Sequence, residues 1–397
     1  MSCGKENYSP CSQGCEKKTK CTCECTKSYP KEICNECVNQ EGITFDGICN
    51  SADFPVDVTT WVDLTVVGTA VVPSEKPSIE DVDKIGVKVE ILSRKVIVTP
   101  DSEDTPNFEG KKVTGKKLIV QGLVCLKISY VSLTPEQSVH SFHSAIPFST
   151  FIVLPNDANA KCGYDISACV EEVCVRRICE RSVELTAAIF LKTEELRSLS
   201  SDTDMNDITD ASGINCRGLD KCPTNECFTD NPDIKGVCDP LTLETLIVPT
   251  DREWTEISVP ELLNIPALKP DIYQIASVNS RIEIMCQDVI KTPTAVANSE
   301  GTILTGYKLL VHALLRQRIT YISTKNCGAV HSAHYDVPIT AYIVLDGDEE
   351  VTNLTRKYRI KACIEDVYAC PLNERQIFKS TTLFFKATPI ELCSKED

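Results

Sequence analysis

Hydrophobic and polar residues alternate along residues 117–132, KLIVQGLVCLKISYVS, as they do in a β-strand with one buried face. One face carries Leu118, Val120, Gly122, Val124, Leu126, Ile128 and Tyr130. The other face carries Gln121, Cys125, Lys127 and Ser129. The same alternation returns in residues 308–323, whose polar face carries His312, Arg316, Arg318 and Thr320. Since successive side chains of a strand point to opposite sides, both stretches predict half-buried strands.

Most of the chain occurs twice. Residues 76–100 match 269–293, and residues 139–154 match 330–345, at shifts of 193 and 191 positions. The two tryptophans, Trp61 and Trp254, are also 193 positions apart. The near-constant shift predicts two homologous domains that superpose, at residues 50–197 and 240–397. Each is long enough to bury a hydrophobic core of its own.

Within each repeat, the periodicity indicates many strands and little helix. Strand-like runs occupy residues 87–98, 117–131, 139–154, 164–175 and 182–192. The exception is the stretch after Lys76-Pro77, where Ile79, Val82 and Ile85 recur at helical spacing and predict a short helix. The fold class expected is therefore mainly β, with two tandem antiparallel β-sandwich-like domains, each with a short helix.

Charge and composition exclude several classes of protein. The chain has 397 residues and a formal net charge of −16, which opposes binding to nucleic acid. No stretch approaches the roughly 20 apolar residues of a membrane span. The N-terminal MSCGKENYSP lacks the apolar segment of a secretory signal, so synthesis in the cytoplasm is expected.

The chain contains 23 cysteines, and 13 of them lie in two irregular segments. Nine occur in residues 1–49, a cysteine-rich arm with too few apolar residues to form a core. Four more occur in residues 198–239, an acidic linker rich in Ser, Thr and Asp. Removing residues 1–48 is therefore expected to leave both repeats folded.

Inside the repeats the cysteines do not follow the sequence repeat. Only Cys169 and Cys363 correspond, so most of the others are expected on surfaces specific to each copy. We expect cross-linking, within or between chains, from the irregular segments and the polar strand faces. The candidates are Cys3, Cys11, Cys15, Cys21, Cys23, Cys25, Cys34, Cys37, Cys49, Cys125, Cys169, Cys216, Cys222, Cys227, Cys238 and Cys363.

Metal binding is the alternative use of these thiols. CTCEC at 21–25 and CNEC at 34–37 form a cluster that could bind zinc, although the first lacks the Cys-x-x-Cys spacing of a zinc ribbon. His140 and His143 recur as His331 and His334, but on a strand positions i and i+3 point to opposite faces. We therefore predict no metal at the histidines. No catalytic motif is present, so no enzyme, catalytic residue or cofactor is expected.

The order of the repeated segments resembles the SPOCS domain of endospore-forming bacteria, found in spore coat and exosporium assembly proteins. The resemblance is carried by KPSI at 76–79, EIL and VIVTP within 90–100, the strand at 117–130, and PFSTFIVLP at 147–155. It covers both repeats, although the second has Pro338-Ile339-Thr340 in place of Pro-Phe-Ser. Tandem units behind a cysteine-rich arm are similar to the basal-layer proteins of clostridial exosporium, which form cross-linked hexagonal lattices.

The resemblance implies a structural protein of the spore's outer layer, the exosporium. It would be made in the mother-cell cytoplasm without a signal peptide and would assemble into a disulfide-cross-linked two-dimensional lattice. Its partners would be copies of itself, as hexameric units, and other coat or exosporium proteins. Two alternatives stay open: a zinc-binding protein that uses the cysteine cluster, and a docking module for spore coat assembly.

Overall fold

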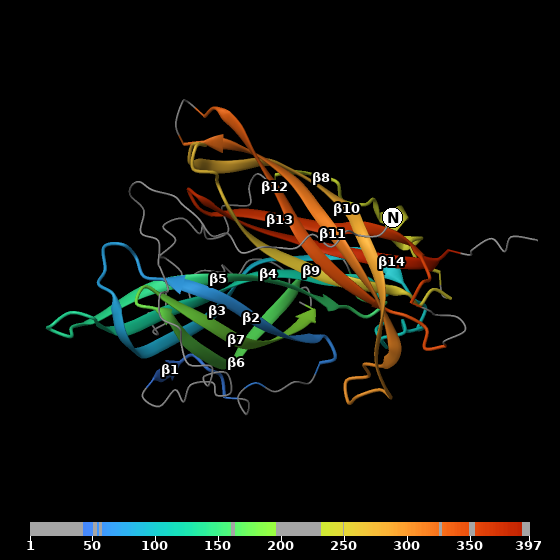
Figure 1. The fold of residues 1–397 in the computed structure, drawn as a ribbon, viewed down its shortest axis with the longest axis horizontal. Coiled ribbons are helices and arrows are strands. Elements are labelled where there is room, and N and C mark those ends of the chain that lie inside the picture. The colour runs from blue at the N-terminus through green and yellow to red at the C-terminus, as the bar shows by residue number, and fades with distance from the viewer. Residues whose placement is uncertain are drawn as a thin grey trace, which may run out of the picture. The chain divides into compact units, whose positions relative to one another are not determined.

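The structure, a computed structural model, describes residues 43–50, 54, 58–159, 163–195, 232–248, 250–324, 328–348 and 354–390. The chain divides into two units, Met1–Asn39 and Gln40–Asp397. The second unit contains both sequence repeats, and its strands are labelled in Figure 1.

The first repeat folds into two sheets. A four-stranded sheet has the order β1-β3-β4-β5, from β1 (Thr44–Asp46), β3 (Ile79–Asp101), β4 (Thr114–Ser132) and β5 (Val139–Val153). A three-stranded sheet has the order β2-β7-β6, from β2 (Trp61–Val71), β7 (Ser182–Glu195) and β6 (Tyr164–Cys179). All these pairings are antiparallel except that of β1 with β3.

The second repeat has the same topology. Its four-stranded sheet has the order β12-β11-β10-β8, from β8 (Asp233–Lys235), β10 (Ile272–Ala295), β11 (Leu304–Ser323) and β12 (Val330–Val344). Its three-stranded sheet has the order β13-β14-β9, from β9 (Trp254–Asn264), β13 (Tyr358–Asn373) and β14 (Gln376–Pro389). One short helix, α1 (Pro240–Glu244), precedes β9.

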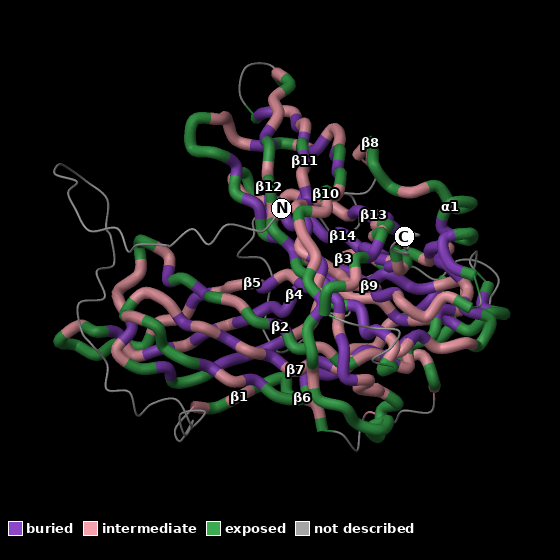
Figure 2. The backbone as a smooth tube through the Cα atoms, turned by 45° about the vertical axis from the view of Figure 1, so that its right-hand side comes forward, coloured by how far each residue is buried: buried purple, intermediate pink, exposed green. Residues whose placement is uncertain are grey.

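In each repeat the two sheets enclose one core. Ile128 and Tyr130 from β4 pack with Leu185 and Ile189 from β7, and all four are fully buried. The second repeat has a matching core between its own two sheets. Figure 2 shows buried residues alternating with exposed ones along many of these strands. The mainly β, antiparallel, sandwich-like class is therefore confirmed.

The prediction of a short helix after Lys76 is wrong. Residues 79–101 form a single strand, with register shifts between Ile79 and Asp81 and between Val82 and Lys84. Each β-bulge inserts one residue and so restores the inward direction three positions later instead of two. Ile79, Val82 and Ile85 therefore all point into the core, at a spacing that resembles a helix. The same shifts occur at the start of β10.

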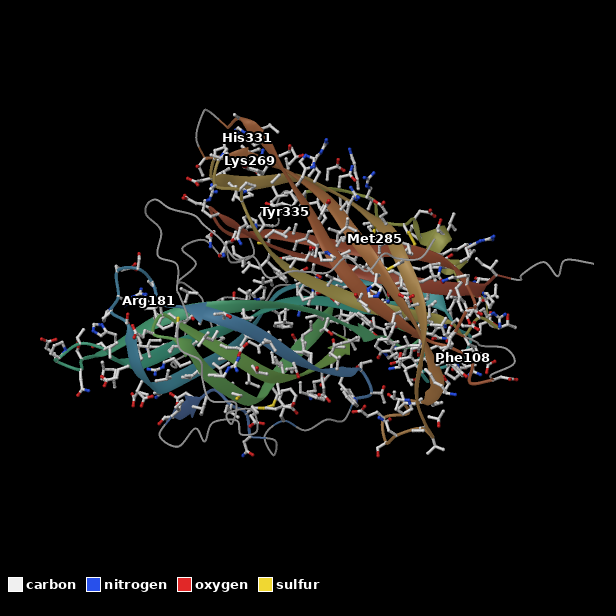
Figure 3. The ribbon with its side chains drawn as sticks, viewed as in Figure 1. Phe108, Arg181, Lys269, Met285, His331 and Tyr335 are labelled. Carbon is white, nitrogen blue, oxygen red and sulfur yellow. A yellow bond between two sulfur atoms is a disulfide. The ribbon has the colours of Figure 1, made fainter. Side chains whose placement is uncertain are left out.

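One set of arginine hydrogen bonds occurs in both repeats. The Arg181 guanidinium, labelled in Figure 3, donates to the carbonyl oxygens of Val72, Pro73 and Lys76 at 2.6–3.0 Å. Arg375 makes the same three bonds to Ile265, Pro266 and Lys269 in the second repeat. These contacts hold the connection that follows β2 or β9, which explains why the arginine recurs in the sequence.

Both repeats begin earlier than the sequence pattern suggested. β1 lies in the segment assigned to the arm and pairs with β3, while β8 lies in the segment assigned to the linker and pairs with β10. A glycine with positive φ directly follows each short strand, Gly47 at 93° and Gly236 at 96°. A Cβ on Gly47 would lie 2.0 Å from the Val87 carbonyl oxygen, so the close approach requires glycine.

The prediction of a half-buried strand is right for β11 and wrong for β4. Along β11, buried and partly exposed residues alternate from Leu309 to Ser323. Along β4, both faces are buried in the stretch from Lys117 to Leu126. The outward side chains of β4, including Gln121 and Cys125, are covered by the second repeat.

Candidate assembly surfaces

A buried lysine links the two repeats. Lys117 on β4 contacts the carboxylates of Glu256 on β9 and Glu365 on β13. Its Nζ lies 2.8 Å from Oε2 of Glu365, and these two side chains are 1% and 0% exposed. A buried ion pair is stable only when its charges are well matched, and here two carboxylates share one ammonium.

The excess carboxylate changes the protonation of this site. Burial raises the pKa of Glu365 to about 7; Lys117 lowers it, and Glu256 adds to the rise. Burial disfavours the Lys117 ammonium, but the two carboxylates outweigh that effect and raise its pKa. Oε1 of Glu365 is buried without a hydrogen-bond partner, which suits a carboxyl group that retains its proton near neutral pH.

Hydroxyl groups continue the contact beside the lysine. Oγ of Ser149 on β5 lies 2.9 Å from Oγ of Ser258 on β9 and 2.6 Å from Oγ of Ser380 on β14. A buried apolar cluster follows, formed by Leu123, Cys125, Leu372 and Phe378. The outer face of β3, β4 and β5 is therefore packed on the outer face of β9, β13 and β14. We call this packing the inter-repeat contact.

The loop between β3 and β4 covers the tryptophan of the second repeat. Nδ2 of Asn107 donates to the Trp254 carbonyl oxygen at 2.9 Å. The backbone N–H of Phe108 donates to the Arg252 carbonyl oxygen at 3.1 Å. Trp254 is only 1% exposed, whereas Trp61, at the matching position of the first repeat, is 46% exposed. Leu243, Leu246 and Ile247 of the second repeat and Val113 of the loop complete the buried cluster around Trp254.

Two disulfides between described residues lie at equivalent positions of the two repeats. Cys49 is bonded to Cys169, and Cys238 is bonded to Cys363. Each bond ties the segment after the first short strand to a strand of the three-stranded sheet, β6 or β13. The sequence comparison found Cys169 and Cys363 but missed their partners, because Gly47-Ile-Cys49 matches Gly236-Val-Cys238 at a different shift of 189. These four cross-linking candidates are joined within the chain.

The remaining candidates have different positions. Cys125 is fully buried in the inter-repeat contact, where a surface position had been expected, and it is itself disulfide-bonded. Eleven further candidates lie outside the described residues, namely Cys3, Cys11, Cys15, Cys21, Cys23, Cys25, Cys34, Cys37, Cys216, Cys222 and Cys227.

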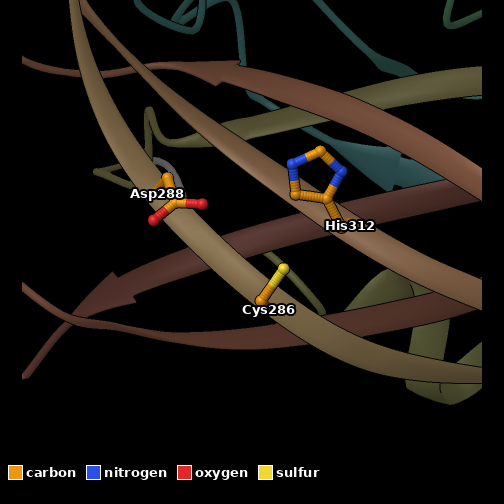
Figure 4. Close-up of side chains that lie close together, drawn as sticks. All are labelled: Cys286, Asp288 and His312. Carbon is orange, nitrogen blue, oxygen red and sulfur yellow. The ribbon is translucent and has the colours of Figure 1, made fainter. Parts of the chain in front are cut away.

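One group of potential metal ligands lies on the second repeat. Cys286 and Asp288 on β10 and His312 on β11 place their ligand atoms within 4.8 Å of one another (Figure 4). Cys286 and His312 are directly paired across the two strands. The sequence analysis did not single out this group because His312 is 24–26 positions from the other two residues and meets them only through strand pairing.

The recurrent histidines are not part of that group. The His140 ring lies 5.9 Å from that of Tyr130, and the His331 ring lies 5.9 Å from that of Tyr321. Within the residues searched, the group of potential ligands contains neither histidine pair. Equivalent ring contacts in both repeats give these histidines a packing role.

Two sheet faces carry large apolar side chains at the surface. The outer face of β10, β11 and β12 exposes Met285 (57%) and Tyr342 (40%), and a depression there is lined by Arg281, Arg316 and Arg318, among others. The outer face of β2, β6 and β7 exposes Val67 (59%), together with Trp61. Exposed apolar patches rimmed by charges are typical of interaction surfaces.

No helix in the described part of the chain is long and apolar enough to cross a membrane. Comparison with curated proteins and with solved structures gave no match. A family model described as SipL, SPOCS domain, matches residues 78–178, which run from the start of β3 almost to the end of β6. The match supports the SPOCS family for the first repeat, whose fold the second repeat shares.

Proposed function

We propose that this protein is a structural component of the bacterial spore's outer layer, the exosporium, and that it assembles into a disulfide-cross-linked two-dimensional lattice. The SPOCS-domain match supports a role in the spore coat. The protein would act without catalysis, as a building block made in the mother-cell cytoplasm. Copies of itself and other coat proteins would be its partners.

The observation that carries this proposal is that the cysteines lie in two kinds of place, inside the folded repeats and in the irregular segments. The disulfides Cys49–Cys169 and Cys238–Cys363, at equivalent positions, each close a sandwich internally. Most of the other cysteines lie in residues 1–49 and 198–239, where the sequence offers little core to stabilise. Thiols placed outside the folded units are suited to bonds between chains, which make dissociation require cleavage of a covalent bond.

Electron microscopy and gel electrophoresis of the recombinant full-length protein test the proposal. We expect ordered sheets after oxidation, and bands of high mass that survive hot detergent but fall to monomers when a strong reductant is added. Circular dichroism should show that the β-sheet signal survives reduction at room temperature. Oxidised protein that runs as a monomer in hot detergent without reductant would rule out cross-linking between chains. Monomers that contain zinc would instead favour a metal-binding role.

A further inference from the structure

The inter-repeat contact uses only one of the two outer sheet faces of each repeat. It covers the β3–β4–β5 face of the first repeat and the β9–β13–β14 face of the second. We propose that the remaining two faces bind each other between copies: the β10–β11–β12 face of one copy docks on the β2–β6–β7 face of another. The inference rests on the proposed self-assembly and names the surface that drives it.

The lysine of the inter-repeat contact has a counterpart on the open face. Lys308 occupies on β11 the position of Lys117 on β4. Each ammonium lies over an aromatic ring of the neighbouring strand: Lys117 is 4.6 Å from the ring centre of Phe151, and Lys308 is 4.2 Å from that of Tyr342. Among the described residues Lys308 forms no ion pair, so its charge is available to a partner.

The two carboxylates also have counterparts, and both are exposed. Asp63 occupies on β2 the register position that Glu256 occupies on β9. Glu171 on β6 occupies the bulge that Glu365 occupies on β13. The docked pair therefore brings Lys308 of one copy to Asp63 and Glu171 of the next, as Lys117 meets its two carboxylates within the chain.

Asp63 on this face lies near a like charge of its own chain. Partial burial raises its pKa, and the like charge of Glu300 adds to the rise. In the second repeat, the matching carboxylate of Glu256 faces the Lys117 ammonium instead. An ammonium from a second copy would offset the repulsion and favour the ionised form of Asp63.

The three serine hydroxyls of the inter-repeat contact have threonine counterparts on the two open faces. Ser149 corresponds to Thr340 on the open face of the second repeat. Its two partners correspond to Thr65 and Thr186 on the open face of the first repeat. A hydroxyl both donates and accepts a hydrogen bond, so three threonines can reproduce the network of three serines.

The apolar cluster is replaced by a charge-complementary one. Its four members, Leu123, Cys125, Leu372 and Phe378, have as counterparts Leu314, Arg316, Ile178 and Glu184. Arg316 and Glu184 carry opposite charges and come from the two faces that we propose to join. Within one chain Arg316 is paired with Glu283 and Glu184 with Arg176, so docking would exchange these partners. Such pairs across an interface fix its register and exclude wrong partners.

The loop that covers Trp254 is repeated as well. Oδ1 of Asn107 accepts two backbone N–H bonds in a tight turn, and Oδ1 of Asn298 accepts the equivalent two. Asn107 uses its amide to bind the Trp254 carbonyl. The counterpart of that site is Trp61, which is half-exposed, while the Asn298 loop is bound within its own chain, where the N–H of Ile303 donates to the Glu109 carbonyl oxygen at 2.9 Å.

Because the two faces differ, this contact is head-to-tail. Each copy that docks leaves one face of each kind free for the next copy, so assembly continues until the chain of copies closes or is terminated. A contact of this type can generate an extended structure without any additional binding site.

Charge exchange on the two faces tests the proposal. Full-length protein is kept reduced, so that covalent bonds between chains do not contribute, and its mass is followed by analytical ultracentrifugation against concentration. We expect K308E, and separately D63K/E171K, to raise the dissociation constant about tenfold or more, since each reverses a charge in the interface. K308E/D63K/E171K should restore assembly by exchanging the two charges. K361E, an exposed lysine on β13, is the matched control.

A mixture of the two single-face variants gives a sharper outcome. In an equimolar mixture of K308E and D63K/E171K, both the native contact and the charge-exchanged contact can form, so the mixture should assemble although each variant alone does not. If K308E assembles like the wild type, the surface is wrong although self-assembly stands. If the wild type stays monomeric under both reducing and oxidising conditions, the proposed function fails and the docking surface fails with it.

A second and independent observation concerns the potential ligands on the same face. The geometry points to a divalent cation, with zinc the best match, at Cys286, Asp288 and His312. A thiolate, a carboxylate and an imidazole are the ligands that zinc prefers, and three protein ligands leave one position open. In the first repeat the same positions hold Ser93, Lys95 and Gln121, which cannot form such a site.

Hydrogen exchange measured by mass spectrometry resolves this site despite the many other cysteines. In a non-chelating phosphine reductant, adding zinc should slow the exchange of β10 and β11 amides in the wild type. In H312Q, zinc should leave their exchange rates unchanged. Peptides from β3 and β4 of the same sample are the internal control. Zinc-dependent protection that is absent from the wild type, or equal in H312Q, would overturn the metal site.

Discussion

The Nζ atom of Lys117 lies 2.8 Å from Oε2 of Glu365, and these two buried residues belong to different repeats. The same lysine reaches Glu256, so one side chain of the first repeat joins two strands of the second. No such pairing exists for Lys308 among the described residues. Equivalent residues of a repeated sequence therefore have different energetic roles, because one lies in a contact and the other on an open face.

Replacing Lys117 by alanine should destabilise the protein by about 3–5 kcal/mol, since two buried carboxylates would lose their only cation. Chemical denaturation of the monomeric protein measures this loss. Lys308→Ala is the matched control and should change the free energy of unfolding by less than about 1 kcal/mol. Equal losses in the two variants would show that the inter-repeat contact does not depend on the buried charge.

The raised pKa of Glu365 predicts a pH dependence of stability. With a folded-state pKa of about 7 against an ordinary value of 4.5, the folded protein binds more protons than the unfolded chain between these values. Stability should therefore fall as pH rises through this window, by at most about 1.4 kcal/mol per pH unit. The free energy of unfolding, measured against pH, should fall less steeply in Glu365→Gln than in the wild type. Glu171→Gln, at the exposed counterpart, should leave the wild-type slope unchanged.

The disulfides Cys49–Cys169 and Cys238–Cys363 should stabilise their own sandwiches. The bonded residues are 120 and 125 positions apart, so each bond strongly restricts the unfolded chain. Cys169→Ser and Cys363→Ser should each lower the free energy of unfolding by about 2–4 kcal/mol under oxidising conditions. Cys49→Ser should match Cys169→Ser, and the double variant should lose no more than either. Additive losses would show that these two residues act separately.

Two truncations locate the start of the first repeat. Removing residues 1–41 should leave the cooperative thermal transition unchanged, since β1 and Cys49 remain. Removing residues 1–48 deletes β1, which pairs with β3, and should lower the stability of the first repeat. Differential scanning calorimetry compares the two, and both truncations should weaken assembly after oxidation. Identical transitions in the two truncations would show that β1 contributes nothing.

Local periodicity was a sound guide to the strands and an unreliable guide to their irregularities. The alternation of β11 predicted which side chains face the core, because a strand repeats every two residues. The spacing of Ile79, Val82 and Ile85 suggested a helix because two bulges had shifted the inward positions. A bulge is recognised by strand pairing, and the partner strand β4 lies more than 40 residues further along the chain.

The sequence by itself determined that the protein has two homologous β-rich units, since each repeat carries its own alternation and its own recurrent Tyr130 or Tyr321. Only the tertiary structure decided which faces of those units are covered. The outer face of β4 is polar enough in sequence to predict exposure, yet Gln121 and Cys125 are buried because the second repeat packs there. Burial of an outer face depends on a neighbour that is distant in sequence. For the same physical reason, the strand pattern could not pair Lys117 with Glu365 or Cys49 with Cys169.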